Sequence, residues 1–162
     1  AYQRDFERYS KQNKINPAWA FAISRRESAF MVDAHSHAGA HGLMQVLPST
    51  ARYVNKRKVS KRNLLKARTN ISLGTKYLKY LLGKHDDNNV LATAAYNAGS
   101  HRVKRWLKKQ DNIAEDVWIE TIPYKETRDY VKSVLAYQQI YQLKAGNNQA
   151  LFDDLAEMEI GE

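Results

Sequence analysis

The 162-residue sequence contains no cysteine, so neither disulfide bonds nor thiolate metal ligands can contribute to this protein. No apolar run approaches the roughly 20 residues needed to cross a bilayer. The first residues also lack the apolar region of a secretory signal peptide. We therefore expect no transmembrane segment. If the protein is exported, the sequence is a mature chain or an excised domain.

Acidic residues are scarce in most of the chain, which has 26 Lys and Arg, 17 Asp and Glu and a formal net charge of +9. Residues 146–162 carry five of the acids and no base, so residues 1–145 hold 26 bases and 12 acids. Such a body attracts nucleic acid, anionic lipid or an acidic cell-wall polymer, unless its basic surface is merely solvated. We expect one domain over residues 1–145 and an acidic tail over 146–162 that docks or frays.

Helical spacing of apolar residues recurs along the chain, and no segment alternates apolar and polar residues between turn signals. This pattern predicts an all-α fold. Asn70 and Ser100 are the expected N-caps of two helices, and Gly99 the residue that ends the helix before Ser100. Helices are expected over residues 2–14, 17–30, 48–56, 70–84, 90–98, 113–120 and 123–143, with a short one in the basic stretch 55–69 and one beginning at Ser100.

Glu27 is the candidate catalytic residue of this sequence, and it lies on a predicted helix that begins at Pro17. Asn16 and Pro17 are good starting residues for its helix. On the helical wheel Glu27 falls in an apolar arc between Ile23 and Ala20. Burial of a carboxyl group disfavours its charged form, which is the condition that a general acid needs near neutral pH. An ion pair with Arg26 or another core arginine is the structural alternative.

Three of the five histidines, His35, His37 and His41, lie in the glycine-containing stretch 29–42, which is predicted to be a shaped loop. No nearby residues complete a ligand set, and loop histidines two residues apart are weak evidence for a metal site. We therefore expect neither a metal nor another cofactor.

Four motifs occur in one order along the chain. They are Glu27-Ser28, residues 42–45 (Gly-Leu-Met-Gln), residues 95–99 (Ala-Tyr-Asn-Ala-Gly), and Tyr130 after residues 122–124 (Ile-Pro-Tyr) and 126–128 (Glu-Thr-Arg). Together they resemble the catalytic domain of the soluble lytic transglycosylases, whose relatives include goose-type lysozyme. The resemblance covers about residues 10–140 and is close to the C-terminal domain of the large enteric bacterial members. His37 stands where many relatives have a proline, which bears on the stiffness of the loop.

The resemblance implies a lysozyme-like helical fold with a substrate groove. It also implies cleavage of the β-linked bond between N-acetylmuramic acid (MurNAc) and N-acetylglucosamine (GlcNAc) in peptidoglycan, with closure of the muramic C6 hydroxyl to an anhydro-MurNAc end. Glu27 would be the single catalytic acid and base, assisted by the substrate's acetamido group. The residues expected at the substrate are Ser36, Met44, Gln45, Tyr96, Asn97, Glu126, Arg128 and Tyr130.

The implied partners are peptidoglycan glycan strands and muropeptides rather than nucleic acid. The expected enzyme is a periplasmic lyase of cell-wall degradation and biogenesis, monomeric and part of a larger chain. Two alternatives stay open. One is a goose-type lysozyme with the same fold and a hydrolytic outcome. The other is a non-catalytic basic module that binds nucleic acid or cell wall. The sequence does not distinguish exo from endo action or the need for stem peptides.

Overall fold

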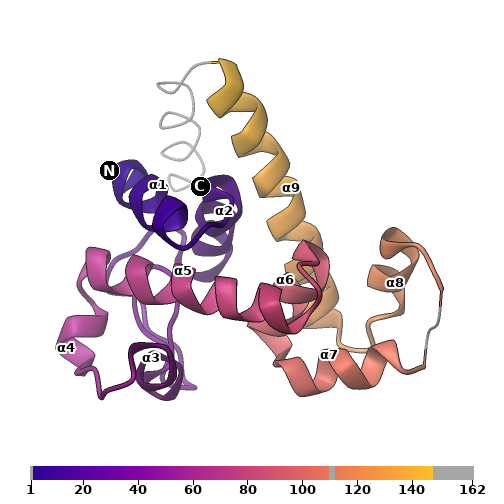
Figure 1. The fold of residues 1–162 in the computed structure, drawn as a ribbon, viewed down its shortest axis with the longest axis horizontal. Helices are drawn as coiled ribbons and strands as arrows, with labels where there is room; N and C mark the ends of the chain where they lie inside the picture. The colour runs from indigo at the N-terminus through magenta and orange to yellow at the C-terminus, as the bar shows by residue number, and fades with distance from the viewer. Residues whose placement is uncertain (1, 110–111, 148–162) are drawn as a thin grey trace.

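The computed structural model describes residues 2–109 and 112–147. Within them the chain forms nine α-helices and no β-strand, apart from two single-residue bridges in the loop after α2, so the predicted all-α class is confirmed (Figure 1). The helices are α1 (Gln3–Gln12), α2 (Pro17–Ser28), α3 (Pro48–Asn55), α4 (Lys61–Leu64), α5 (Ala67–Lys84), α6 (Asn89–Ala98), α7 (Ser100–Leu107), α8 (Glu115–Thr121) and α9 (Lys125–Asn147).

The helix α2 is buried on most sides. It begins as predicted, with the Asn16 side chain accepting a 2.9 Å hydrogen bond from the backbone N–H of Ala18 and with Pro17 at the first position. Trp19 is almost completely buried, and its indole N–H donates to the Thr93 hydroxyl of α6 at 2.9 Å. Because α2 also packs along α9, it lies between two helices that each supply expected site residues.

The long helix α5 crosses the middle of the molecule and contacts α1, α3, α4 and α6 (Figure 1). Its buried face carries Ile71, Leu78 and Leu81, each with no exposed surface. Such side chains contribute about 1.5–3 kcal/mol each by leaving water. In Figure 1, α3 and α4 lie below one end of α5 and α7 below the other, α8 stands at the far right beyond α7, and α9 rises from the α6 end. The helix α5 is therefore the element that joins the two sides.

Two expected helix caps are wrong. The helix α5 begins at Ala67, so Asn70 lies inside its first turn, where its side chain is completely buried and bonded to other segments. Gly99 is the N-cap of α7, and Ser100 is its first helical residue, with its hydroxyl 3.0 Å from His85 Nε2. The last helix runs to Asn147, beyond the predicted end at residue 143. Most of the expected tail, 146–162, lies outside the described residues.

Candidate active site

Glu27 lies in the last turn of α2, one residue before the end of the helix. The chain leaves the helix through Ala29 and Phe30, both in the left-handed conformation with φ of 50° and 62°. The hydroxyls of Ser24 and Ser28 both donate to the Leu43 carbonyl, at 2.9 and 2.7 Å. These two bonds fix the end of α2 against the loop that contains residues 42–45, so the first two motifs of the sequence are held side by side.

The carboxyl group of Glu27 is strongly perturbed. Burial is the largest cause, and it raises the pKa from 4.5 to about 8, while the positive charge of Arg26 opposes the shift and the negative charge of Glu126 adds to it. The negative end of the α2 dipole acts in the same direction as burial. The residue as a whole is half-buried, so its side chain is largely enclosed but can still be reached from solvent. Glu27 is therefore an acid that keeps its proton at neutral pH.

An ion pair does not account for Glu27. Within residues 2–109 and 112–147 its carboxyl group forms no hydrogen bond or salt bridge. The Arg26 guanidinium instead lies over the ring of Tyr130, 5.4 Å from its centre. The structural alternative considered for this glutamate, a core ion pair with Arg26, is thus not formed.

Two tyrosine hydroxyls lie close to Glu27. Burial, and after it the negative charge of Glu27, raise the pKa of Tyr96 and that of Tyr130 well above the ordinary value. The Tyr96 hydroxyl donates to the Met44 carbonyl at 2.6 Å. The Tyr130 side chain is almost completely buried on α9, and among the described residues its hydroxyl has no hydrogen-bond partner. The structure therefore brings together the protonated carboxyl group of Glu27, the Tyr96 hydroxyl, which is bonded to the Met44 carbonyl, and the Tyr130 hydroxyl, which has no partner among the described residues.

The helices α6 and α9 are tied together beside this cluster. The Thr127 hydroxyl donates to the side-chain carbonyl of Asn97 at 2.7 Å, and Arg128 donates to the Ile122 carbonyl at 3.0 Å, which holds the turn that precedes α9. Glu126 is exposed, and its charge reaches Glu27. Tyr96, Glu126 and Tyr130 are thus electrostatically linked to Glu27, whereas Asn97 bonds Thr127 and Arg128 supports its own helix end.

The loop residues differ in their positions. The Gln45 amide donates to the carbonyls of Ala34 and Gly42, at 3.0 and 2.9 Å, and its side chain lines a cavity. The side chain of Met44 is completely buried against α5, whereas the resemblance led us to expect it at the wall of a sugar subsite. The Ser36 hydroxyl accepts a 3.1 Å bond from the Ala40 N–H and stabilises a turn. The described contacts do not join Ser36 to Glu27.

Asn70 organises the loop, and the sequence analysis missed this role by assigning it to a cap. Its amide N–H₂ donates to the carbonyls of His41 and Leu64, at 2.7 and 2.8 Å, and its carbonyl accepts from the Met44 N–H at 2.7 Å. Gly42, with φ of +80°, leaves room for this side chain. A Cβ on residue 42 would lie 2.8 Å from the Asn70 Cγ and 2.8 Å from the Leu64 carbonyl oxygen. No local sequence signal reveals this role, because two of the three partners of Asn70 lie 26 and 29 residues earlier in the chain.

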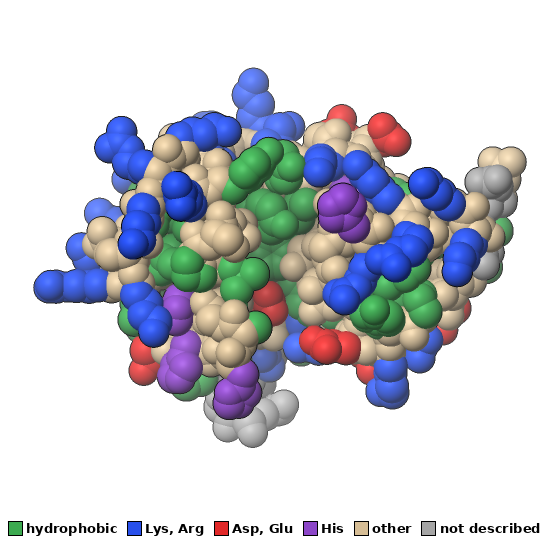
Figure 2. All heavy atoms as spheres, turned by 90° about the horizontal axis from the view of Figure 1, so that it is seen from below, with side chains coloured by type: hydrophobic (Ala, Val, Ile, Leu, Met, Phe, Trp, Pro, Cys, Tyr) green, Lys and Arg blue, Asp and Glu red, His purple; other side chains and the backbone are tan. Residues whose placement is uncertain are grey.

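A cavity of about 270 Å³ lies next to the Glu27 cluster. Its wall includes Gln45, Tyr77, Tyr96 and Asn97, so it is formed by the loop, α5 and the end of α6. Figure 2 shows the corresponding face as a hollow with hydrophobic side chains at its bottom and Lys and Arg on both sides. Glu27 itself does not line the cavity, but Tyr96 does, and the charge of Glu27 acts on Tyr96, so this tyrosine connects the cavity with the acid.

The described part of the chain contains no group of three or more histidine, aspartate or glutamate side chains placed to hold a metal ion. His41 pairs with Val46 through the backbone and is buried, which lowers the pKa of its ring. None of the described helices is long and apolar enough to cross a membrane.

Comparisons with known proteins identify the family of this chain. The family described as "Transglycosylase SLT domain" matches residues 5–119, and the "Soluble lytic transglycosylase helical domain" matches residues 121–150. The chain therefore belongs to the soluble lytic transglycosylase family. It is 41% identical over 160 residues to the soluble lytic murein transglycosylase of Salmonella typhimurium, and 40% identical over 157 residues to that of Escherichia coli. These alignments cover 95% and 93% of the chain but only about a quarter of each relative.

Solved structures show the same relationship. A Pseudomonas aeruginosa lytic transglycosylase, described as an inactive mutant in which a glutamate is replaced by glutamine, superimposes with a TM-score of 0.87 and 44% identity over 92% of this chain. The 70-kDa soluble lytic transglycosylase of Escherichia coli gives 0.87 with 41% identity over 90% of this chain. The chain covers 25% of each of these structures. The lysozyme-like fold class expected from the resemblance is confirmed.

Proposed function

We propose that this chain is the catalytic domain of a peptidoglycan lytic transglycosylase that cleaves the MurNAc–GlcNAc β-glycosidic bond in the periplasm and acts on glycan strands and muropeptides. The observation that carries the proposal is Glu27, an unpaired carboxyl group with a pKa of about 8 beside a cavity. Family membership and the names of the relatives, which are murein transglycosylases, support the substrate class. The excess of Lys and Arg suits a polymer whose peptides carry carboxylates.

In the first step, the Glu27 carboxyl group donates its proton to the glycosidic oxygen as the bond to the MurNAc anomeric carbon breaks. The pKa of about 8 keeps this proton available at neutral pH. The oxygen of the substrate's own acetamido group bonds to the anomeric carbon and takes the place of the nucleophilic carboxylate of other retaining glycosidases. One protein carboxylate is then sufficient.

In the second step, the Glu27 carboxylate removes the proton from the muramic C6 hydroxyl, whose oxygen bonds to the anomeric carbon while the acetamido oxygen leaves it. The product is a 1,6-anhydro-MurNAc end, and Glu27 is protonated again. The hydroxyl belongs to the same sugar, so it is already positioned, and it outcompetes water where the site is dry. Burial, the largest cause of the raised pKa of Glu27, is consistent with a dry site.

We assign supporting roles to the surrounding residues. The Tyr130 hydroxyl faces the Glu27 carboxyl region and orients it, which would explain a buried hydroxyl without a partner. Tyr96 and Asn97 hold the floor of the site, and Gln45 presents its amide at the cavity wall. Ser36, Glu126 and Arg128 contact the substrate at the edges of the groove, and Met44 shapes it through its backbone carbonyl.

Digestion of purified sacculi followed by mass spectrometry of the released muropeptides tests the function. We expect anhydro products, which are lighter by one water than those of a hydrolase, and no turnover by a folded Glu27→Gln variant. Products that contain the added water would make the chain a goose-type lysozyme. An active Glu27→Gln protein would overturn the assignment of the acid. Absence of cleavage, together with steeply salt-dependent nucleic-acid binding, would favour a binding module.

A further inference from the structure

Four tyrosine rings on three helices form a continuous row that begins at the candidate active site. Tyr96 of α6 lies beside Glu27, and the centre of its ring is 5.6 Å from that of Tyr77 on α5. Tyr80, one turn further along α5, follows at 6.0 Å with its ring nearly parallel to that of Tyr77, at 19°. Tyr53 of α3 is next, with its ring centre 5.1 Å from that of Tyr80. The row thus leads from the acid to the outer edge of α3.

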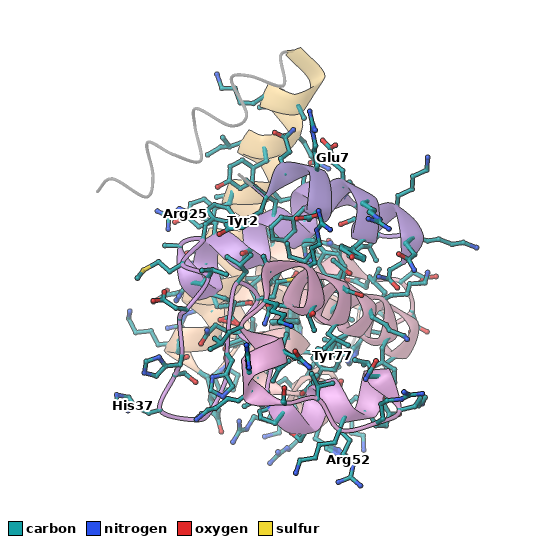
Figure 3. All side chains as sticks on the ribbon, turned by 90° about the vertical axis from the view of Figure 1, so that its left-hand side faces the viewer. Tyr2, Glu7, Arg25, His37, Arg52 and Tyr77 are labelled. Carbon is teal, nitrogen blue, oxygen red and sulfur yellow. The ribbon has the colours of Figure 1, made fainter. Side chains whose placement is uncertain are left out.

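The outer part of this row reaches solvent. Tyr53 is 53% exposed and Tyr80 is half-buried, and their hydroxyls lie 3.3 Å apart, which fixes the two rings relative to each other. Tyr77 lines the cavity of about 270 Å³ and so connects the exposed rings with the enclosed ones. Figure 3 shows Tyr77 below α5, on the side where Arg52 of α3 also lies. An exposed run of rings that leads out of a cavity indicates a surface that receives a ligand.

A lysine ammonium lies over each of the two outer rings. The Lys56 ammonium lies 5.2 Å from the ring centre of Tyr53, and that of Lys84 lies 5.4 Å from the ring centre of Tyr80. Among the residues that the structure describes, neither lysine pairs with a carboxylate. Such contacts are weak at exposed sites, and the lysine stem is flexible, so a ligand displaces the ammonium groups easily. They then remain beside the rings as unpaired cations.

We propose that Tyr77, Tyr80 and Tyr53 form an extended saccharide track that binds successive sugar rings of a β-linked amino-sugar chain outside the catalytic cavity, with Lys56 and Lys84 binding carboxylates of its peptides. The proposal rests on the proposed function, because it takes the chain cleaved at Glu27 as its ligand. One face of a pyranose ring is made of C–H groups and packs on an aromatic face, while its polar groups point sideways to hydroxyls and water. Binding energy gained at such remote rings helps to hold the scissile bond at the acid.

Length-dependent kinetics test the track. The substrates are long uncrosslinked glycan strands and a tetrasaccharide of the same repeat, which is too short to occupy both the cavity and the outer rings. The Y53A/Y80A variant should lose about tenfold in kcat/KM on long strands, the change expected for the loss of two aromatic contacts, and little on the tetrasaccharide. The matched Y53F/Y80F variant keeps the rings and should resemble the wild type. Equal losses on both substrates, or no loss on either, would overturn the proposal.

A binding measurement separates this proposal from the proposed function. Calorimetric titration of the E27Q and E27Q/Y53A/Y80A proteins with the same strands reports affinity without cleavage. If the wild type cleaves no glycan, the proposed function fails, yet a length-dependent loss of affinity in the triple variant would still support the track. Tighter binding of a single-stranded oligonucleotide that depends on Tyr53 and Tyr80 would overturn it, because bases also stack on exposed rings.

The lysines have their own control. The K56Q/K84Q change, introduced into the E27Q protein, should weaken binding of strands that carry stem peptides by several-fold and leave binding of peptide-free strands unchanged. The loss should shrink as the salt concentration rises. An equal effect on both kinds of strand would show that Lys56 and Lys84 do not bind the carboxylates of the stem peptides.

Discussion

The side-chain carbonyl of Asn70 accepts a 2.7 Å hydrogen bond from the backbone N–H of Met44, and both residues are completely buried. With its two donated bonds to the carbonyls of His41 and Leu64, this asparagine attaches the loop of residues 42–45 to the first turn of α5. The same loop is held on its other side by Ser24 and Ser28 of α2. The position of Gln45 and of the Met44 carbonyl relative to Glu27 therefore depends on polar side chains that are themselves outside the cavity.

Replacement of Asn70 by alanine should destabilise the protein by about 2–4 kcal/mol, because it leaves buried backbone groups of three segments without partners. Asn70→Asp should be at least as damaging, since a carboxylate can accept the Met44 bond but cannot donate the other two. Urea denaturation measures both. The exposed Asn63, replaced by alanine, is the control and should change stability by no more than about 0.5 kcal/mol. An Asn70→Ala protein as stable as this control would contradict the role of Asn70.

Gly74 and Gly83 of α5 make a matched pair. A Cβ on Gly74 would lie 2.9 Å from the Met44 Cβ, whereas a Cβ on Gly83 would meet nothing within 4 Å. Gly74→Ala should therefore cost about 1–3 kcal/mol and reduce activity by displacing the loop. Gly83→Ala should stabilise the helix by up to about 1 kcal/mol. Thermal denaturation and muropeptide release provide the two measurements, and similar effects of the two substitutions would contradict this packing.

Two charged neighbours should move the pH dependence of activity in opposite directions. The general acid works only when protonated, so kcat/KM should fall as the pH rises through about 8. Glu126 raises the pKa of Glu27, so Glu126→Gln should shift this fall to lower pH. Arg26 lowers that pKa, so Arg26→Gln should shift it to higher pH. Asp116 lies exposed on α8, and Asp116→Asn changes the net charge by the same amount as Glu126→Gln. This control should leave the pH profile unchanged. Shifts in the same direction would refute the assignment.

Glu27 should also make stability depend on pH. Its folded pKa of about 8 lies above the ordinary 4.5, so between these values the folded chain holds a proton that the unfolded chain has lost. Stability therefore decreases as pH rises through this window, by at most roughly 1.4 kcal/mol per pH unit. Glu27→Gln removes the decrease, so the variant should gain stability relative to the wild type as the pH rises from about 5 to about 8. Urea titrations at several pH values measure this, and a constant difference would show that the carboxyl group is not enclosed.

Tyr130→Phe should affect activity without affecting stability. The hydroxyl has no partner in the described structure, so its removal should leave the free energy of unfolding unchanged or slightly higher. If the hydroxyl orients Glu27, activity should nevertheless fall by about tenfold, a loss typical of one catalytic hydrogen bond. Tyr137→Phe, on the same helix, should leave both quantities unchanged. A Tyr130→Phe protein that is fully active would remove Tyr130 from the site.

Features that depend on neighbouring residues were predicted correctly from the sequence. Asn16 and Pro17 define the start of α2, and Glu27 on its apolar arc carries the expected raised pKa. These features depend on residues close together in sequence, where helical geometry alone decides which side chains share a face.

The misplaced features depend on contacts between distant segments. Asn70 has the residue type of a cap, but its partners lie in the loop and at the end of α4, so sequence spacing could not reveal its buried role. The Met44 side chain packs against Gly74 of α5, 30 residues later in the chain, and spacing does not reveal this contact either. The row of Tyr53, Tyr80, Tyr77 and Tyr96 forms only when α3, α5 and α6 pack together, so the sequence did not show it. The i, i+3 spacing of Tyr77 and Tyr80 does place these two on one face of α5.

The packing of α2 along α9 has a consequence for dividing the protein into parts. The matched family regions meet at residues 119–121, yet Glu27 lies before this point and Tyr130 after it. A fragment that stopped at residue 120 would expose the flank of α2 to water and would lack Tyr130, which lies close to the acid. The two regions are therefore one cooperative unit, and any dissection of the chain has to carry α9 along with the helices before it.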